Sequence, residues 1–119
     1  MNFNSILIGS EDAPRLAAYY TKLFGEPGFS QGGYNGWMIG SGFITVGPHD
    51  QVHGKSSEPG RLIWNIESAD VAADFARLKA AGAIVVREPY EFEMQPNAWI
   101  ATLSDPDGNY FQLLSPMQM

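Results

Sequence analysis

The stretch Asp105-Pro106-Asp107-Gly108-Asn109-Tyr110-Phe111-Gln112-Leu113-Leu114 joins a tight turn to a strand. Pro106 presets φ near −65°, and Gly108 accepts the positive φ that completes a chain reversal. A strand is expected after such a turn, because its side chains alternate between two faces. One face should carry Tyr110, Gln112 and Leu114. The stretch therefore predicts the second strand of a β-hairpin whose first strand is residues 99–104.

An earlier stretch, from Gly40 to Pro48, repeats part of this pattern. Gly40, Phe43 and Pro48 have the spacing of Gly108, Phe111 and Pro116. Internal repetition of this kind indicates two copies of one structural unit. In this alignment Ile44 corresponds to Gln112.

Helix caps, turn residues and alternation predict the order β-α-β-β-β in both halves of the chain. In the first half we expect a strand over residues 3–8, a helix between Asp12 and Gly25, a short strand around Phe29, and a hairpin of residues 37–39 and 43–46. In the second half we expect a strand over residues 61–66, a helix capped by Asp70 and ended by Gly82, strands over 83–86 and 90–94 separated by Pro89, and the hairpin of 99–104 and 109–114. Residues 50–60 have the composition of a linker, so the units are predicted at 1–49 and 61–119.

Composition bounds the function. The 119 residues, 45% of them hydrophobic, suit a single domain built from two repeats. The absence of cysteine excludes disulfides, thiolate nucleophiles and Cys-bound zinc. The net charge of −6 and the lack of basic runs argue against a nucleic-acid partner. No apolar run could span a bilayer and no signal peptide is recognised, so we expect a cytoplasmic protein with no membrane partner.

The segment 105–109, the helical segment from Asp12 to Gly25 and the internal duplication together resemble the vicinal oxygen chelate superfamily. That superfamily includes glyoxalase I, the bleomycin-resistance proteins and the extradiol dioxygenases, and the resemblance covers essentially the whole chain. It implies an α+β fold in which two tandem β-α-β-β-β units form a curved, cup-shaped mixed sheet with helices on the outer face. It also implies a homodimer and, in the enzymes, a divalent metal held by the first and last strand of each unit.

The resemblance assigns one residue of this chain to each metal-ligand position. The first position lies seven residues before Asp12, the helix-opening aspartate. The four positions fall on Ser5, Ile44, Arg61 and Gln112. Divalent metals in such sites need carboxylate or imidazole ligands, which none of these residues supplies. We therefore expect the metal site to be absent and no cofactor to be bound.

The first functional hypothesis is a protein that binds or sequesters a small organic molecule in the cup. Arg61 and Gln112 would be the polar anchors and Trp37 and Tyr110 the apolar walls, with Ser5 and Ile44 as further ligand-binding positions. Arg61 could instead be neutralised by Glu91, Glu93 or Gln112, since a buried charge needs a partner. Trp64 is expected in the core beneath the second helix, and Arg87 and Glu88 carry no specific signal.

The second hypothesis is an enzyme of the same superfamily, a lyase or isomerase. It would use either a relocated divalent metal such as Ni, Zn, Mn or Fe at His49 and His53, or a metal-free mechanism with Arg61 and Glu93 as catalytic residues. The two histidines are four residues apart in a Gly- and Pro-rich segment, which equally suits exposed loop residues. A third hypothesis is an interaction module that dimerises through exposed strands.

Overall fold

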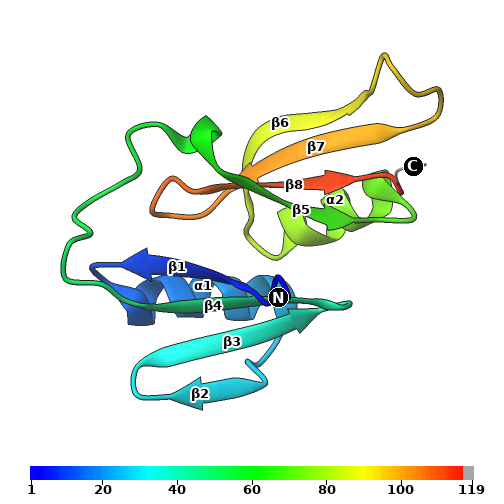
Figure 1. Cartoon of the computed structure of the whole chain (residues 1–119). Helices are drawn as coiled ribbons and strands as arrows, with labels where there is room; N and C mark the ends of the chain where they lie inside the picture. The colour runs from blue at the N-terminus through cyan, green and yellow to red at the C-terminus, as the bar shows by residue number, and fades with distance from the viewer. Residues whose placement is uncertain (117–119) are drawn as a thin grey trace. The chain divides into compact units, whose positions relative to one another are not determined.

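The computed structural model of the protein describes residues 1–116 and contains eight strands, two α-helices and a 3-10 turn (Figure 1). Their order is β1 (Ile6–Ser10), α1 (Ala13–Phe24), β2 (Phe29–Gln31), β3 (Tyr34–Ile39), β4 (Gly42–Pro48), η1 (Pro59–Arg61), β5 (Ile63–Glu67), α2 (Val71–Ala80), β6 (Ile84–Glu91), β7 (Trp99–Ser104) and β8 (Tyr110–Leu114). The chain divides into a first unit, Met1–Lys55, and a second unit that begins at Ser56. The predicted α+β class and the β-α-β-β-β order of both halves are confirmed.

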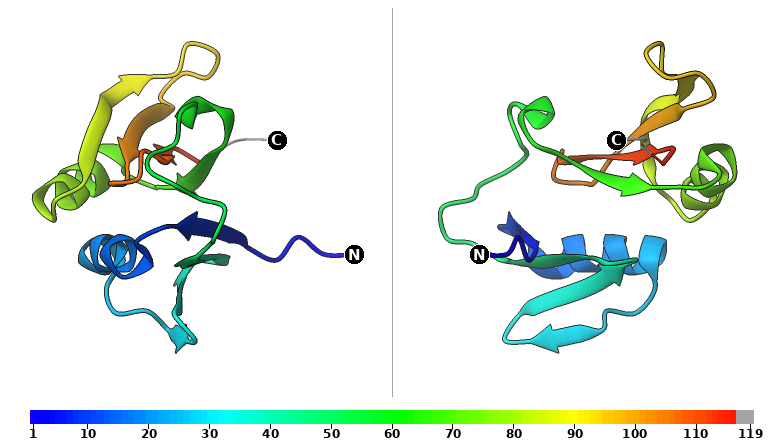
Figure 2. Two further views of the ribbon diagram at one scale, coloured as in Figure 1. Left: turned by 90° about the vertical axis from the view of Figure 1, so that its left-hand side faces the viewer. Right: turned by 45° about the vertical axis from the view of Figure 1, so that its right-hand side comes forward.

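Each unit contains one four-stranded mixed sheet. The strand orders are β1-β4-β3-β2 and β5-β8-β7-β6. In both sheets the first and last strands of the unit pair in parallel, and the other neighbours pair antiparallel. A single helix lies along one face of each sheet, α1 in the first unit and α2 in the second (Figure 2). We call the opposite face of each sheet its open face.

Helix α1 begins and ends where the sequence predicts. The Asp12 carboxylate accepts a hydrogen bond from the Arg15 backbone N–H at 3.3 Å, which satisfies one of the free N–H groups of the first turn. Gly25 ends the helix with φ of 89°, a left-handed conformation that suits glycine. Leu16 and Tyr20 are fully buried, so one face of α1 forms the core of the first unit.

Helix α2 builds the core of the second unit in the same way. The Asp70 carboxylate accepts from the Ala73 N–H at 3.0 Å and caps the helix. The predicted buried face is confirmed, with Val71, Phe75 and Leu78 each less than a tenth exposed. Within residues 1–116 neither this helix nor α1 has the length and apolar character needed to cross a membrane.

Two predicted strand boundaries in the second unit are wrong. Strand β6 runs from Ile84 to Glu91 without a break at Pro89, whereas the sequence predicts two strands there. Pro89 is tolerated because β6 is the last strand in the sheet order and its pairing with β7 shifts register on both sides of Arg87. Strand β5 begins at Ile63 because Arg61 belongs to the preceding 3-10 turn.

Two aromatic rings cover glycines on the open face of the first sheet. The Phe43 ring lies over Gly36, and the Tyr34 ring lies so close to Gly47 that a Cβ there would overlap it. Glycines in strands commonly mark such close approaches. The rings occupy space that any larger side chain at positions 36 and 47 would need.

We expect Gly47→Ala to lower the free energy of unfolding by roughly 1–3 kcal/mol, the usual cost of overpacking. The clash with the Tyr34 ring is the cause, so the same substitution in a Tyr34→Ala background should cost much less. Urea denaturation of the two single variants and the double variant measures this coupling. Equal costs in both backgrounds would show that the ring is not responsible.

Candidate functional site

A row of polar side chains crosses the open face of the second sheet, one from each strand. Asn65 of β5 is the Cα partner of Gln112 of β8, and Gln112 is the partner of Thr102 of β7. Thr102 is in turn the partner of Arg87 of β6. Paired residues on neighbouring strands point to the same face of a sheet. We call Asn65, Gln112, Thr102 and Arg87 the polar row.

Alternation along β8 places this row on the face away from α2. Phe111 and Leu113 are buried on the helix-covered face, and the Phe111 ring stacks on Trp64 with centroids 4.9 Å apart. Tyr110, Gln112 and Leu114 point the other way, as the sequence predicts, and are partly exposed. Trp64 lies on the helix-covered face, as expected, because it is the Cα partner of Phe111, although its side chain is only partly buried.

Gln112 is fixed within the row by a hydrogen bond. Its Nε2 donates to Thr102 Oγ1 at 3.1 Å, and Thr102 is only 7% exposed. Among residues 1–116 no group donates to the Gln112 carbonyl oxygen, so that oxygen remains free to accept from a bound molecule. An oriented amide of this kind gives a site directional preference at low entropic cost.

Arg87 and Tyr90 also share the open face, although they are three residues apart. In a regular strand such residues would point to opposite faces. Here the register shift between them pairs Arg87 with Thr102 and Tyr90 with Ile100. The Arg87 Cζ lies over the Tyr90 ring, 3.5 Å from its centroid. The strand irregularity therefore creates a cation–π contact on the open face.

Two mainly apolar rows flank the polar row on the same face. One row contains Ile63, Tyr110, Ser104 and Ile84. The other contains Leu114, Ile100 and Tyr90, with the exposed Glu67 of β5 at its end. Small-molecule sites typically combine apolar surface with a few placed polar groups. The open face of the second sheet has this composition.

The sequence matches the family described as "Glyoxalase-like domain" over residues 5–114. The chain belongs to this family. A comparison with curated proteins gave no match.

Solved structures share the fold of this glyoxalase-like domain. A glyoxalase/bleomycin resistance protein from Albidiferax ferrireducens T118 is 23% identical, with a TM-score of 0.70 over 97% of this chain and 98% of that one. TioX from Micromonospora sp. ML1 is 17% identical, with a TM-score of 0.74 over 98% of this chain and 100% of that one. The fosfomycin resistance protein FosX from Listeria monocytogenes is 18% identical, with a TM-score of 0.70 over 98% and 94%. The family match, together with this shared fold, is consistent with the vicinal oxygen chelate superfamily that the sequence resembles.

The structure separates the predicted anchors of the glyoxalase-like domain. Gln112 and Tyr110 lie together on the open face of the second sheet. Arg61 lies on η1, is 71% exposed, and forms an ion pair with Glu58 at 2.8 Å. The first residue of β5 is instead Ile63, which precedes Asp70 by seven residues, the interval between Ser5 and Asp12. Counting from the helix cap in both units would have selected Ile63.

In the first unit, Trp37 and Ile44 lie on the helix-covered face. They are Cα partners in the β3–β4 ladder and are 2% and 5% exposed. Thr45 alternates onto the open face and pairs with Leu7, two residues after Ser5. In the second unit Gln112 pairs with Asn65, two residues after Ile63. Register therefore matches Thr45 with Gln112, and the alignment that selected Ile44 is displaced by one residue.

The resemblance to the superfamily implies four metal-ligand positions, one on the first and one on the last strand of each unit. The interval to the helix caps selects Ser5 and Ile63 for the first strands, and register matches Thr45 with Gln112 for the last strands. These residues offer two hydroxyls, an alkyl group and a neutral amide, whereas such metals select carboxylate and imidazole ligands. Among residues 1–116 no group of three or more His, Asp or Glu side chains is arranged to hold a metal.

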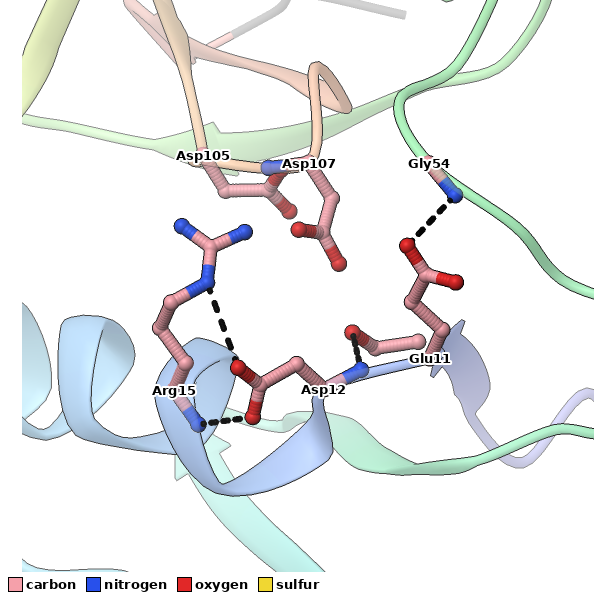
Figure 3. A network of polar contacts seen from close by, with 7 residues as sticks. Glu11, Asp12, Arg15, Gly54, Asp105 and Asp107 are labelled. Carbon is pink, nitrogen blue, oxygen red and sulfur yellow. Dashed lines mark hydrogen bonds and ion pairs between the residues drawn. The ribbon is translucent and has the colours of Figure 1, made fainter.

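The two histidines make separate contacts within the first unit. His49 Nδ1 accepts from the Gln51 N–H at 3.2 Å, and His53 Nδ1 lies 3.7 Å from the Glu11 carboxylate. Glu11 also accepts from the Gly54 N–H at 2.9 Å (Figure 3). The side chains of His49 and His53 are 46% and 77% exposed. Both histidines are therefore exposed loop residues that make local contacts.

Sequence reasoning missed Asn65, Thr102, Arg87 and Tyr90 as one group. Alternation alone could have placed Asn65 and Thr102 beside Gln112. Arg87 and Tyr90 had one usable signal, Pro89 between them, because proline inside a strand marks an edge or a bulge. A bulge there changes which side chains share a face.

Proposed function

We propose that this glyoxalase-like domain binds a small organic molecule on the open face of its second sheet and does not transform it. The observation that carries the proposal is the polar row between two mainly apolar rows. A flat apolar part of a ligand would lie against Tyr110 and Ile100, while its polar groups meet the row.

Gln112 is the central anchor in this proposal. Its amide is oriented by Thr102, and its carbonyl oxygen accepts from a hydroxyl or N–H of the ligand. Asn65, which is exposed beside it on β5, offers a second amide with both donor and acceptor capacity. The pair selects ligands with hydrogen-bonding groups over purely apolar ones.

The side chains at the positions that the resemblance assigns to metal ligands support binding over metal-dependent turnover. Ser5, Thr45, Ile63 and Gln112 lack the charged or imidazole ligands that would hold a divalent ion. Homodimerisation stays a prediction of the resemblance.

We expect a probe such as 4-hydroxybenzamide or 4-hydroxybenzoate, at millimolar concentration, to raise the thermal midpoint of the protein. A ligand at a hundred times its Kd adds about 2.7 kcal/mol of stability, which is several degrees for a chain of this size. Gln112→Leu should abolish the rise because it removes the anchor. Gln51→Leu, at an exposed loop position, is the matched control and should retain it.

Three results would contradict this proposal. No probe raises the midpoint, or Gln112→Leu retains the full rise, or the probe is converted to a product by the protein. The last result would support the predicted lyase or isomerase. Arg61→Ala and Glu93→Ala would then show whether those residues are catalytic.

A further inference from the structure

Arg87 is a cation without a carboxylate partner on the proposed binding face. Arg15, Arg61, Arg77 and Lys79 form ion pairs with carboxylates, whereas Lys22, Lys55 and Arg87 form none within residues 1–116. Within residues 1–116 the Arg87 side chain forms neither an ion pair nor a hydrogen bond, and its contact is the Tyr90 ring. The chain has 13 Asp and Glu and only seven Lys and Arg, so a shortage of carboxylates does not explain why Arg87 lacks an ion pair.

The acidic neighbours of Arg87 on β6 are committed to other partners. Glu88, the next residue, lies 3.7 Å from the Lys79 ammonium. Glu91 accepts a hydrogen bond from the Asn97 N–H at 3.2 Å and pairs with Trp99, on the helix-covered face. The strand thus directs its carboxylates away from the face on which Arg87 lies.

The Tyr90 ring holds the guanidinium in place without using its N–H groups. A guanidinium over an aromatic ring keeps its donors at its edge, where they can meet an oxyanion in a bidentate manner. The register shifts on both sides of Arg87 bring the two side chains to one face. Irregular strand pairing is a feature often found beside binding sites, where it re-aims a side chain.

We infer that Arg87, supported by Tyr90, makes the open face of the second sheet selective for small organic anions, and this inference rests on the proposed binding function. The oxyanion, a carboxylate or a phosphonate, binds the Arg87 guanidinium, and a donor elsewhere on the ligand binds the Gln112 carbonyl. Arg87 and Gln112 lie on strands separated by β7, which puts their backbones roughly 10 Å apart. A single aromatic ring with an acid at one end and a hydroxyl at the other spans the gap left by the two side chains.

The test compares three probes that differ in one group: 4-hydroxybenzoate, 4-hydroxybenzamide and 4-hydroxybenzylamine. We expect the anion to bind the wild-type protein about tenfold or more tightly than the neutral amide, as charge-assisted hydrogen bonds allow, and the amine to bind weakest. Titration by nuclear magnetic resonance gives each Kd. In 4-hydroxyphenylphosphonate a phosphonate replaces the carboxylate. The probe with the lower Kd shows which of the two oxyanions the site prefers.

Variants assign the selectivity to Arg87. Arg87→Ala should raise the Kd of the anion about tenfold and change the Kd of the neutral amide by less than about twofold. Tyr90→Leu should raise the Kd of the anion by a smaller factor. Arg77→Ala, on α2 and paired with Asp74, is the matched control and should change neither. Unliganded thermal midpoints check that each variant is folded.

The inference is overturned if the wild-type protein binds anion and amide equally, if Arg87→Ala weakens both to the same extent, or if Arg61→Ala rather than Arg87→Ala removes the preference. In each of these cases the amide still binds, so the proposed binding function survives. Failure of every probe would instead remove the proposed function, and this inference with it.

Discussion

Trp37→Ala should lower the free energy of unfolding by about 3–5 kcal/mol, the range for truncating a large buried aromatic residue. The Trp37 side chain is 2% exposed and lies between the sheet and α1, with its ring centroid 6.1 Å from that of Tyr20. Its Nε1 donates to the Gly25 carbonyl at 2.8 Å, which satisfies a backbone group at the end of α1. Urea denaturation followed by far-ultraviolet circular dichroism measures the loss.

Trp37→Phe separates packing from the hydrogen bond. The phenylalanine ring keeps much of the contact but cannot donate the hydrogen bond. We expect the loss of that bond to lower the free energy of unfolding by about 1 kcal/mol, in addition to the effect of the smaller ring. A small effect of Trp37→Ala on stability, together with weaker probe binding, would contradict this account. That result would restore the sequence-based hypothesis that Trp37 lines the ligand site.

Asp105→Ala should destabilise the protein by about 3–4 kcal/mol, since it removes a buried charged acceptor from several donors at once. Asp105 is 1% exposed. Its Oδ1 accepts from the backbone N–H groups of Asp107 and Asn109, each at 2.9 Å, and its carboxylate also accepts from Asn109 Nδ2. These bonds hold the β7–β8 turn, in which Gly108 donates to the Asp105 carbonyl at 3.0 Å.

Two variants make the test of Asp105 specific. Asp105→Asn keeps an oxygen acceptor and should recover part of the stability, because one N–H of the turn can still be satisfied. Asp50→Ala, at a carboxylate that is 97% exposed, should change stability by less than about 0.5 kcal/mol. If Asp105→Ala were no worse than Asp50→Ala, the turn would not depend on the carboxylate.

The Asp105 turn also shows why parts of the fold were predictable. A turn, a helix cap and a glycine stop each depend on residues within a few positions of one another. The Asp-Pro-Asp-Gly sequence, the caps Asp12 and Asp70, and the alternation of β8 therefore gave correct elements. Face assignments derived from alternation within β8, including that of Gln112, were correct for the same reason.

Assignments that needed the partner strand were less secure. Ile44 and Thr45 are adjacent in sequence, yet one is buried against α1 and the other lies on the open face. A shift of one residue in an alignment reverses the face of a side chain, because the period of a strand is two. The alternating apolar residues that follow Arg61 predicted that it begins a strand. In the structure Arg61 belongs to a 3-10 turn and forms an ion pair with Glu58.

The sequence by itself determined the two β-α-β-β-β units, their helix caps, the Asp105 turn and the face of Gln112. These properties follow from local backbone preferences and from side-chain type. Only the tertiary structure decided that Arg87 and Tyr90 share a face with Thr102 and Gln112. That grouping depends on register shifts between β6 and β7, and a register exists only once two strands have paired.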